Sequence, residues 1–311
     1  MTASRIFFST DIHGSETCFL KFITAADYYK ADALILGGDI TGKAVVPFVE
    51  MKDGGVSATF LGRDYVARTS EEIEKLKRLA RDVGYYVFVT NRDEWAEISS
   101  DKSRTDKLFI ELASERVRQW AEISGQKLRE KKMKIYVTGG NDDPFEIDDV
   151  IKASESFVYC HDQLVELADH EMISTGYANM TPWVLPRDIS EEELGRIIEE
   201  LALRVKDMKN AIFNFHAPPH SSKLDEAPKL TPEMKAQPDF IPVGSTAVRS
   251  AIEKYQPLLG LHGHIHESRG VMKIGDTLCV NPGSEYGEGI LRGAIINLEY
   301  RRIKGYLLTS G

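Results

Sequence analysis

The sequence has few cysteines and no long apolar run. Its 311 residues include three cysteines, Cys18, Cys160 and Cys279, and none belongs to a Cys-x-x-Cys pair. This number and spacing argue against a disulfide framework and a thiolate zinc site, and they predict reduced thiols in a cytoplasmic protein. No apolar run approaches ~18 residues, so we predict no membrane span. The start MTASRIFFST lacks a basic region followed by an apolar one, so we predict no signal peptide.

Basic residues are fewer than acidic ones. The chain has 39 Lys and Arg against 48 Asp and Glu, a formal net charge of −9. This balance argues against nucleic-acid binding driven by phosphate neutralisation, and no basic stripe with interleaved aromatic residues is visible. The negative net charge does not exclude a small phosphorylated substrate, because a local cationic centre such as a metal can outweigh the electrostatic field of the whole protein.

Short apolar runs alternate with amphipathic segments. The runs cover residues 5–10, 33–38, 134–138, 211–215 and 258–262, and their continuous apolar character predicts strands buried on both faces. Helices are predicted at 15–30, 69–81, 104–131, 191–209 and 245–256. The alternation indicates an α/β fold. Successive strands expected between 271 and 309 add mixed or antiparallel pairing, whereas the stretch 217–244, rich in proline and polar residues, is expected to be a long loop.

Each of the five predicted strands is followed by residues that bind metals. Ligands in open α/β sheets bind outside the carboxyl ends of the strands, so these groups are expected to meet in one crevice. The segments read Asp11-Ile12-His13, Gly37-Gly38-Asp39, Gly139-Gly140-Asn141-Asp142-Asp143, Phe215-His216 and Gly263-His264-Ile265-His266. Oxygen and imidazole donors without thiolate suit Mn, Fe, Zn, Co or Mg. Seven side chains are too many for one ion and fit two ions that share a carboxylate.

The ordered set of motifs resembles the calcineurin-like metallophosphoesterase superfamily. The family pattern is Asp-x-His, Gly-Asp, Gly-Asn-His-Asp/Glu, a lone His and Gly-His-x-His, and the resemblance spans residues 5 to about 290. The turn Asn281-Pro282-Gly283-Ser284 is similar to one often seen in bacterial and archaeal members. The resemblance implies a four-layer α/β/β/α sandwich with two mixed β-sheets, and two divalent metal ions such as Mn, Fe, Zn or Co.

The resemblance also implies a role for each ligand. Asp11, His13 and His266 would hold one metal ion, and Asp39 would bridge both. Asn141, His216 and His264 would hold the second ion. A water or hydroxide that bridges the two ions would attack phosphorus in line.

Two positions are candidates for protonating the leaving group. Asp142 stands where many family members carry a His that assists the leaving group, and a carboxylic acid could do this work only with a raised pKa. A solvated carboxylate is the alternative for Asp142. His220 follows His216 by four residues and is expected at the mouth of the site, as a phosphate contact, a surrogate proton donor or a solvated loop residue. Asp143 matches the family's carboxylate, for which orienting a ligand is the expected role.

The chain is expected to form one domain, 1–311, with an insertion at about 43–133. Asp39 and Asn141 are 102 positions apart, which is more than compact members of the family use. The inserted segment is expected to act as a cap that selects substrate or as a surface for homo-oligomerisation.

These observations predict a metal-dependent phosphoesterase that hydrolyses phosphodiester or phosphomonoester bonds. The missing motif His favours diesters, which need less protonation of the leaving group. One alternative is a phosphomonoesterase for a nucleotide or small metabolite. Another, from a different class, is a non-catalytic binding scaffold on the phosphoesterase fold, as in the retromer subunit that resembles this family. The filled ligand positions argue against the scaffold.

Overall fold

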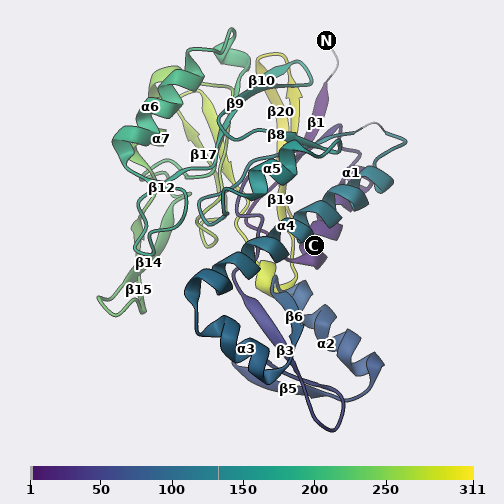
Figure 1. Ribbon diagram of the computed structural model, residues 1–311. Helices are drawn as coiled ribbons and strands as arrows, with labels where there is room; N and C mark the ends of the chain where they lie inside the picture. The colour runs from purple at the N-terminus through teal and green to yellow at the C-terminus, as the bar shows by residue number, and fades with distance from the viewer. Residues whose placement is uncertain (1–2, 132) are drawn as a thin grey trace.

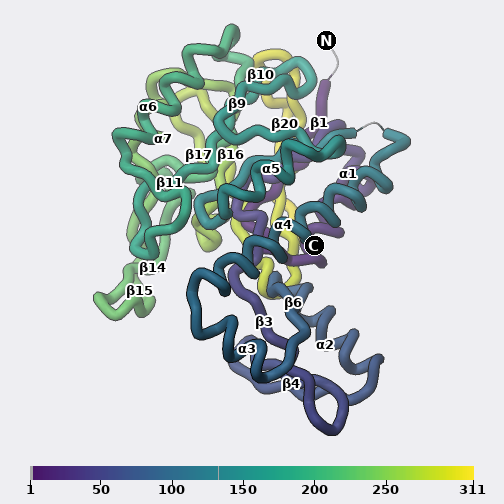
Figure 2. Tube along the Cα trace, viewed as in Figure 1, coloured from purple at the N-terminus to yellow at the C-terminus, as the bar shows by residue number. Residues whose placement is uncertain are grey.

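A computed structural model describes residues 3–131 and 133–311 (Figures 1 and 2). Two six-stranded sheets dominate it. The first has the strand order β20-β19-β1-β2-β7-β8. Its bounds are β1 Ser4–Ser9, β2 Ala33–Leu36, β7 Ile135–Val137, β8 Phe157–Tyr159, β19 Arg292–Glu299 and β20 Arg302–Ser310. Strands β1, β2, β7 and β8 run parallel, whereas β19 and β20 pair antiparallel, so this sheet is mixed.

The second sheet has the strand order β17-β18-β16-β13-β10-β9. Its bounds are β9 Gln163–Leu167, β10 His170–Thr175, β13 Ile212–Phe215, β16 Leu259–Leu261, β17 Gly270–Ile274 and β18 Thr277–Asn281. The central strands β10, β13, β16 and β18 are parallel, and the two outer strands are antiparallel. Both sheets are therefore mixed, as expected from the sequence.

Three apolar clusters join the layers. Ile6, Phe8 and Ile35 of the first sheet are buried together with Leu261 and Val280 of the second, so the sheets face each other. The outer face of the first sheet is covered by α1 (Glu16–Tyr28), α4 (Lys102–Lys127) and α5 (Ile147–Lys152). The outer face of the second sheet is covered by α6 (Glu191–Ala202) and α7 (Thr246–Tyr255). The four-layer α/β/β/α sandwich predicted from the sequence is confirmed.

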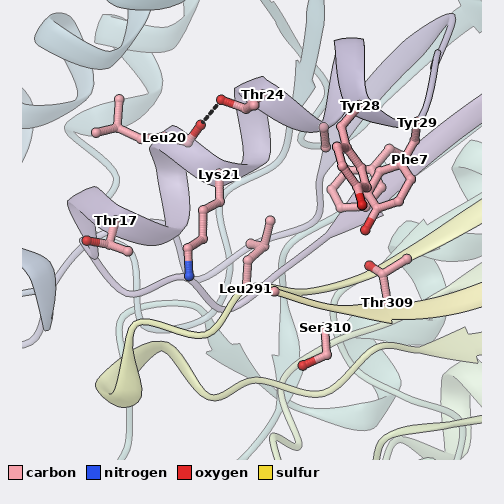
Figure 3. Close-up of a pocket in the computed structure, with 12 residues that line it drawn as sticks. Phe7, Thr17, Leu20, Lys21, Thr24, Tyr28, Tyr29, Leu291, Thr309 and Ser310 are labelled. Carbon is pink, nitrogen blue, oxygen red and sulfur yellow. Dashed lines mark hydrogen bonds between the residues drawn. The ribbon is translucent and has the colours of Figure 1, made fainter.

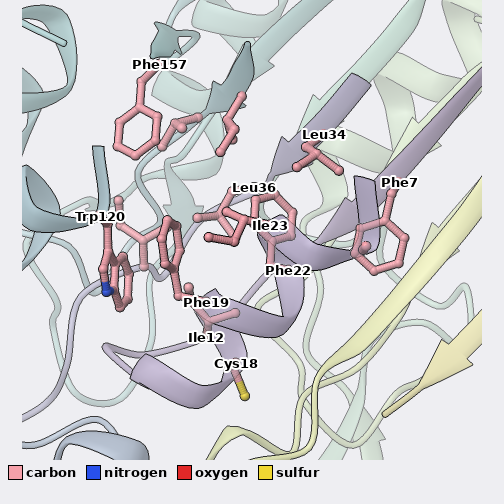
Figure 4. Close-up of a cluster of buried hydrophobic side chains, with 14 of the residues drawn as sticks. Phe7, Ile12, Cys18, Phe19, Phe22, Ile23, Leu34, Leu36, Trp120 and Phe157 are labelled. Carbon is pink, nitrogen blue, oxygen red and sulfur yellow. The ribbon is translucent and has the colours of Figure 1, made fainter. Parts of the chain in front are cut away.

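Aromatic side chains anchor the first helical layer (Figure 4). The ring of Phe19 in α1 stacks on that of Trp120 in α4, with centroids 4.2 Å apart and planes within 3°. Phe22 packs against Phe7 of β1 at 6.0 Å. These helices thereby fix the start of the loop that follows β1.

Residues within the predicted insertion form a separate four-stranded sheet, seen at the bottom of Figure 1. Its order is β5-β4-β3-β6, from β3 Val45–Glu50, β4 Val56–Phe60, β5 Arg63–Ala67 and β6 Tyr86–Thr90. Helix α2 (Ser70–Asp82) packs on it, and α3 (Arg92–Ser99) leads to α4. Lys132, at the end of the predicted insertion, lies outside the described residues, as do the first two residues of the chain. The boundary 43–133 stays a prediction.

The inserted sheet meets the sandwich through three glycines. A Cβ atom on Gly84, in the turn between α2 and β6, would lie 2.0 Å from the carbonyl oxygen of His13. One on Gly42 would lie 2.0 Å from the carbonyl oxygen of Gly84, and one on Gly14 would lie 2.7 Å from Gly42. Because backbones this close leave no room for a side chain, glycine is required at the contact.

The long loop predicted over 217–244 is wrong. This stretch contains a hairpin of β14 (Glu226–Leu230) and β15 (Ala236–Pro242), which projects from the sandwich in Figure 1. Its prolines argued against strands. A two-stranded ribbon nevertheless has outward-facing positions on both strands where no N–H is needed, and Pro228 pairs there with Phe240.

Two helical predictions also needed correction. The helix expected over 191–209 ends at Ala202, because Glu171 accepts hydrogen bonds from the backbone N–H groups of Lys206 and Asp207 and draws that segment away; a 3-10 turn, Met208–Asn210, follows. No helix was predicted within 85–100, but the segment contains β6 and α3. Only Trp95 and Ile98 of α3 are partly buried and none of its side chains is fully buried, so its apolar face is too short to mark a helix in the sequence.

The remaining elements are short: β11 (Ala178–Asn179), β12 (Asp188–Ile189) and the 3-10 turn η2 (Tyr286–Glu288). Among the helices that the structure describes, none has the length and hydrophobicity that crossing a membrane would need.

Candidate metal centre

The predicted ligands lie in loops at the carboxyl ends of parallel strands. In the first sheet, these loops follow β1, β2 and β7; in the second, they follow β13 and β16. Because the parallel strands of a sheet share one carboxyl edge, the five loops meet where the two sheets adjoin. Three groups of side chains there have ligand atoms within 4.8 Å of one another; one of them, His13, Asp39 and Asp142, shares members with the other two, and those two share none. The first of these two groups is Asp11, His13 and His266, and the second is Asp39, His216 and His264.

In the first group, two imidazoles face each other. The Nε2 atoms of His13 and His266 are 3.1 Å apart, and Nε2 of His266 lies 3.4 Å from Oδ1 of Asp11. Burial lowers the pKa of His13 to about 3. The ring is therefore neutral, with a lone pair available. Nitrogen ligands at about 2.1 Å from one ion lie roughly 3–3.5 Å apart, so this spacing fits a shared metal ion.

In the second group, a backbone carbonyl fixes the orientation of an imidazole. Nδ1 of His216 lies 3.1 Å from the carbonyl oxygen of Gly37 and donates a proton there, so Nε2 is the atom that would bind a metal ion once the ring has lost its second proton. That Nε2 is 3.4 Å from Oδ2 of Asp39. In the metal-free protein burial opposes the charged ring, but the carboxylates of Asp39 and Asp11 raise the pKa of His216 to about 9.

Asn141 is oriented by a carboxylate that the sequence analysis did not identify. Its Nδ2 donates to Oδ1 of Asp188 at 2.8 Å. The other oxygen of Asp188 accepts from the backbone N–H and hydroxyl of Thr181 and from the N–H of Leu185. The amide oxygen of Asn141 is therefore the atom available to a ligand. Asp188 is 47 residues away from Asn141 in sequence, and no local motif indicates its role.

Several predicted ligands sit in a strained backbone conformation. Asp11, His13, Asp39 and His264 have φ values of 53°, 40°, 47° and 67°. Residues other than glycine rarely adopt this left-handed region, and each instance costs roughly 1–2 kcal/mol. Such strain clusters at functional sites, where the surrounding structure holds it. Here the N–H of Asp11 donates to Gly38 and that of His13 donates to Asp39, which ties the two ligand loops together.

The fit to metal ions can be judged from buried atoms without partners. Oδ1 of Asn141 and Nε2 of His216 are buried and have no hydrogen-bond partner among residues 3–131 and 133–311. Such atoms are costly unless something binds them. His216 belongs to the cluster of carboxylates and imidazoles, a donor set that suits first-row divalent ions. The residues present therefore fit a metal centre.

Asp143 holds two of the ligand loops together. Its buried carboxylate accepts hydrogen bonds from the N–H groups of Ile40 (3.0 Å), Thr41 (2.8 Å) and Gly140 (2.7 Å), and from the Thr41 hydroxyl (2.6 Å). It thereby links the segment after Asp39 to the segment that carries Asn141. This contact is consistent with the orienting role expected for Asp143.

A fully buried arginine supports the same segment from behind. Arg187 forms an ion pair with Asp148 at 2.8 Å and donates to the carbonyl oxygens of Asp143 and Pro144. Its guanidinium lies over the ring of Phe145 at 4.6 Å. Each contact fixes part of the loop that follows Asn141.

Asp142 lies beside the first metal group. Its Oδ2 is 3.9 Å from Nδ1 of His13 and 3.5 Å from Nζ of Lys43. Burial and the nearby Asp39 carboxylate raise the pKa of Asp142 to about 6, against the opposing effect of Lys43. This direction is the one that a proton donor requires in the metal-free protein. Its catalytic role stays a prediction.

The other histidines make structural contacts. His220 lies in the loop after β13; its N–H donates to Ser245 and its Nδ1 lies 2.9 Å from the Ser221 hydroxyl. Its role in catalysis stays a prediction. Nδ1 of His262 faces the carbonyl oxygens of Phe215 and Ala217, so it packs as expected at a buried strand end. His161 accepts from the Gly176 N–H at 2.9 Å.

A groove of about 460 Å³ lies away from this centre (Figure 3). It runs between α1 and the end of β20, and Leu20, Lys21 and Tyr28 line it from the helix. None of the seven predicted ligands lines it.

Comparison with known proteins gives one sequence relative. No family model matches this chain. The uncharacterised protein MJ1162 of Methanocaldococcus jannaschii is 33% identical over 153 residues, which cover 48% of this chain and 64% of that protein. The match thus spans less than two thirds of the relative.

One solved structure with a similar fold comes from a bacterium. TT1561 of Thermus thermophilus aligns over 100% of this chain and 99% of its own, with a TM-score of 0.54 and 15% identity. An archaeal phosphodiesterase aligns over 99% of both chains at 12% identity, and YfcE, a phosphoesterase from E. coli, over 97% of this chain and 98% of its own at 12% identity. Their TM-scores of 0.38 and 0.36 are too low to relate them closely to this chain.

Proposed function

We propose that this protein is a metal-dependent phosphoesterase. The observation that carries the proposal is the convergence of two ligand groups, with buried donor atoms left unpaired, at the carboxyl edges of both sheets. Asp11, His13 and His266 would hold one ion. His216, His264 and Asn141 would hold the second, with Asp39 shared between the two. Divalent ions bound there would activate water and neutralise the charge of a phosphoryl group.

The chain's own residues prepare the site. The carbonyl of Gly37 accepts from Nδ1 of His216, and Asp188 holds the amide nitrogen of Asn141, which leaves the amide oxygen free to bind an ion. The Asp11 carboxylate also accepts the N–H of His264 at 3.0 Å, so it orders the second sheet's ligand loop. Preorganised ligands do not have to reorganise during the reaction, which is the main source of electrostatic catalysis.

The residue at position 142 bears on which of two substrate classes the site would hydrolyse. A phosphodiester, or another ester with a good leaving group, needs little protonation, whereas a nucleotide or metabolite monoester needs a proton donor such as Asp142 or His220. The site lacks the imidazole that many family members have at position 142, and this supports diesters. The insertion would act as a cap over the crevice or as a surface between copies of the chain.

The test is hydrolysis of bis-p-nitrophenyl phosphate and p-nitrophenyl phosphate by metal-stripped protein. Mn, Fe, Zn, Co and Mg are added back singly. We expect metal-dependent turnover that falls at least about 100-fold in Asp39→Asn, because bound ions are worth several kcal/mol in the transition state. Asp93→Asn on the exposed face of α3 is the matched control and leaves turnover unchanged.

The ratio of the hydrolysis rates of the two aryl phosphates shows whether the enzyme prefers phosphodiesters or phosphomonoesters. Binding of two ions without turnover of either ester, in all five metals, would contradict the enzyme and favour the binding scaffold.

A further inference from the structure

We propose that Lys43 is the residue that recognises the substrate's phosphate group at the metal centre, a role that rests on the proposed phosphoesterase function. Lys43 stands four positions after Asp39, in the loop between β2 and β3. No motif of the sequence singles it out. Its ammonium group nevertheless lies beside residues of the ligand cluster.

The backbone that carries Lys43 is fixed. Thr41 is bound through its N–H and its hydroxyl to the buried Asp143 carboxylate. The N–H of Gly42 donates to the hydroxyl of Tyr86 at 2.7 Å, and Tyr86 belongs to the inserted sheet. A lysine on such a rigid base loses less freedom when it binds a ligand. The side chain is 47% exposed, so its tip reaches solvent and an incoming anion.

The position of the charge is unusual for a surface lysine. Nζ lies 3.5 Å from Oδ2 of Asp142, and the same oxygen is 3.9 Å from the ring of His13. A single carboxylate oxygen therefore stands between the positive charge of Lys43 and His13, a member of the first group of proposed ligands. The repulsion between this cation and metal ions bound nearby would be offset by the attraction of both to an anion that lies between them.

The carboxylate of Asp142 occupies that intermediate place in the structure. A phosphate group carries more charge than a carboxylate and offers more oxygen atoms, and lysine binds phosphate as a compact point charge. The geometry therefore points to an exchange in which a substrate phosphate takes over the Lys43 ammonium from Asp142. The competing explanation is an ordinary ion pair between Lys43 and Asp142, which contributes little when partly exposed.

Binding of inorganic phosphate to the Mn²⁺-loaded protein at pH 8, followed by calorimetry, separates these explanations. We expect Lys43→Met to weaken phosphate binding about tenfold, Lys43→Arg to restore most of it, and Lys52→Met, in the exposed turn between β3 and β4, to leave it unchanged. Affinity for Mn²⁺ in Lys43→Met should equal or exceed that of the wild type, because a repelling charge is gone. Retained metal binding also shows that the variant is folded.

Asp142→Asn gives the sharper comparison. If phosphate replaces Asp142 as the partner of Lys43, it should bind this variant as tightly as the wild type or more tightly, because a competing anion is removed. A loss equal to that of Lys43→Met would overturn the proposal and favour the structural ion pair. Phosphate affinity of Lys43→Met within twofold of the wild type would also overturn it, while wild-type hydrolysis of the aryl esters would leave the phosphoesterase function standing. Absence of both phosphate binding and hydrolysis in the wild type would reject both.

Discussion

Replacement of Asp143 by alanine is expected to destabilise the protein strongly. The carboxylate is fully buried and accepts four hydrogen bonds from three residues on two loops. Alanine would leave three backbone N–H groups and the hydroxyl of Thr41 without this partner. Each unpaired buried donor costs about 1–3 kcal/mol.

Two effects reduce the sum. Water can enter the space left by the carboxylate and pair with some of the donors, and the cost of burying the charge disappears. We therefore expect Asp143→Ala to lower the free energy of unfolding by about 3–5 kcal/mol. Asp149→Ala, at an exposed position of α5, should change it by less than about 0.5 kcal/mol.

Urea unfolding of the metal-free proteins measures this difference, because the midpoint shift multiplied by the slope gives the change in stability. The metal-free state keeps ligand binding out of the comparison. A loss below about 1 kcal/mol for Asp143→Ala would refute the reasoning. It would mean that the loops after β2 and β7 hold together without this carboxylate.

Three further results are expected. Asp188→Ala should weaken metal binding about 10–100-fold in calorimetry, because it releases the amide of Asn141; unchanged affinity would contradict this orientation. Burial lowers the pKa of His161 to about 3, and its Nδ1 must stay unprotonated to accept from Gly176. The free energy of unfolding should therefore fall as pH decreases from about 6.5 toward 3, with up to about 1.4 kcal/mol per pH unit from this group. Urea unfolding at several pH values should show a weaker dependence of the unfolding free energy on pH for His161→Gln than for the wild type. Added Mn²⁺ or Zn²⁺ should raise the melting temperature of stripped protein in a concentration-dependent manner, reversed by a chelator.

The buried strands and the candidate ligands that follow them could be predicted from the sequence because both depend on local patterns, whereas the four-layer sandwich was implied by the family resemblance. Metal binding by these residues stays a prediction. The apolar runs that end at Asp11, Asp39 and His216 are buried strands, and parallel strands bring their carboxyl ends to one edge. Strand identity and ligand position were therefore read from the same few residues.

Other features depend on contacts between distant segments. Asp188 and Arg187 act on the loop of Asn141 from more than 40 positions away, and nothing in the neighbourhood of either residue marks such a role. Lys43 is visible only once the loop after β2 is placed beside Asp142. Helix α3 was missed because its apolar face consists of only two partly buried residues, Trp95 and Ile98.

The close contact of Gly14, Gly42 and Gly84 has a mechanical consequence. The carbonyl of His13 and the backbone of Gly84 touch without side chains between them, so the inserted sheet cannot tilt toward the sandwich without pushing on the His13 loop. The contact would act as a rigid pivot. Any molecule that displaces the inserted sheet would then change the affinity of the proposed site at His13 for a metal ion, and an ion bound there would change the affinity for that molecule by the same factor.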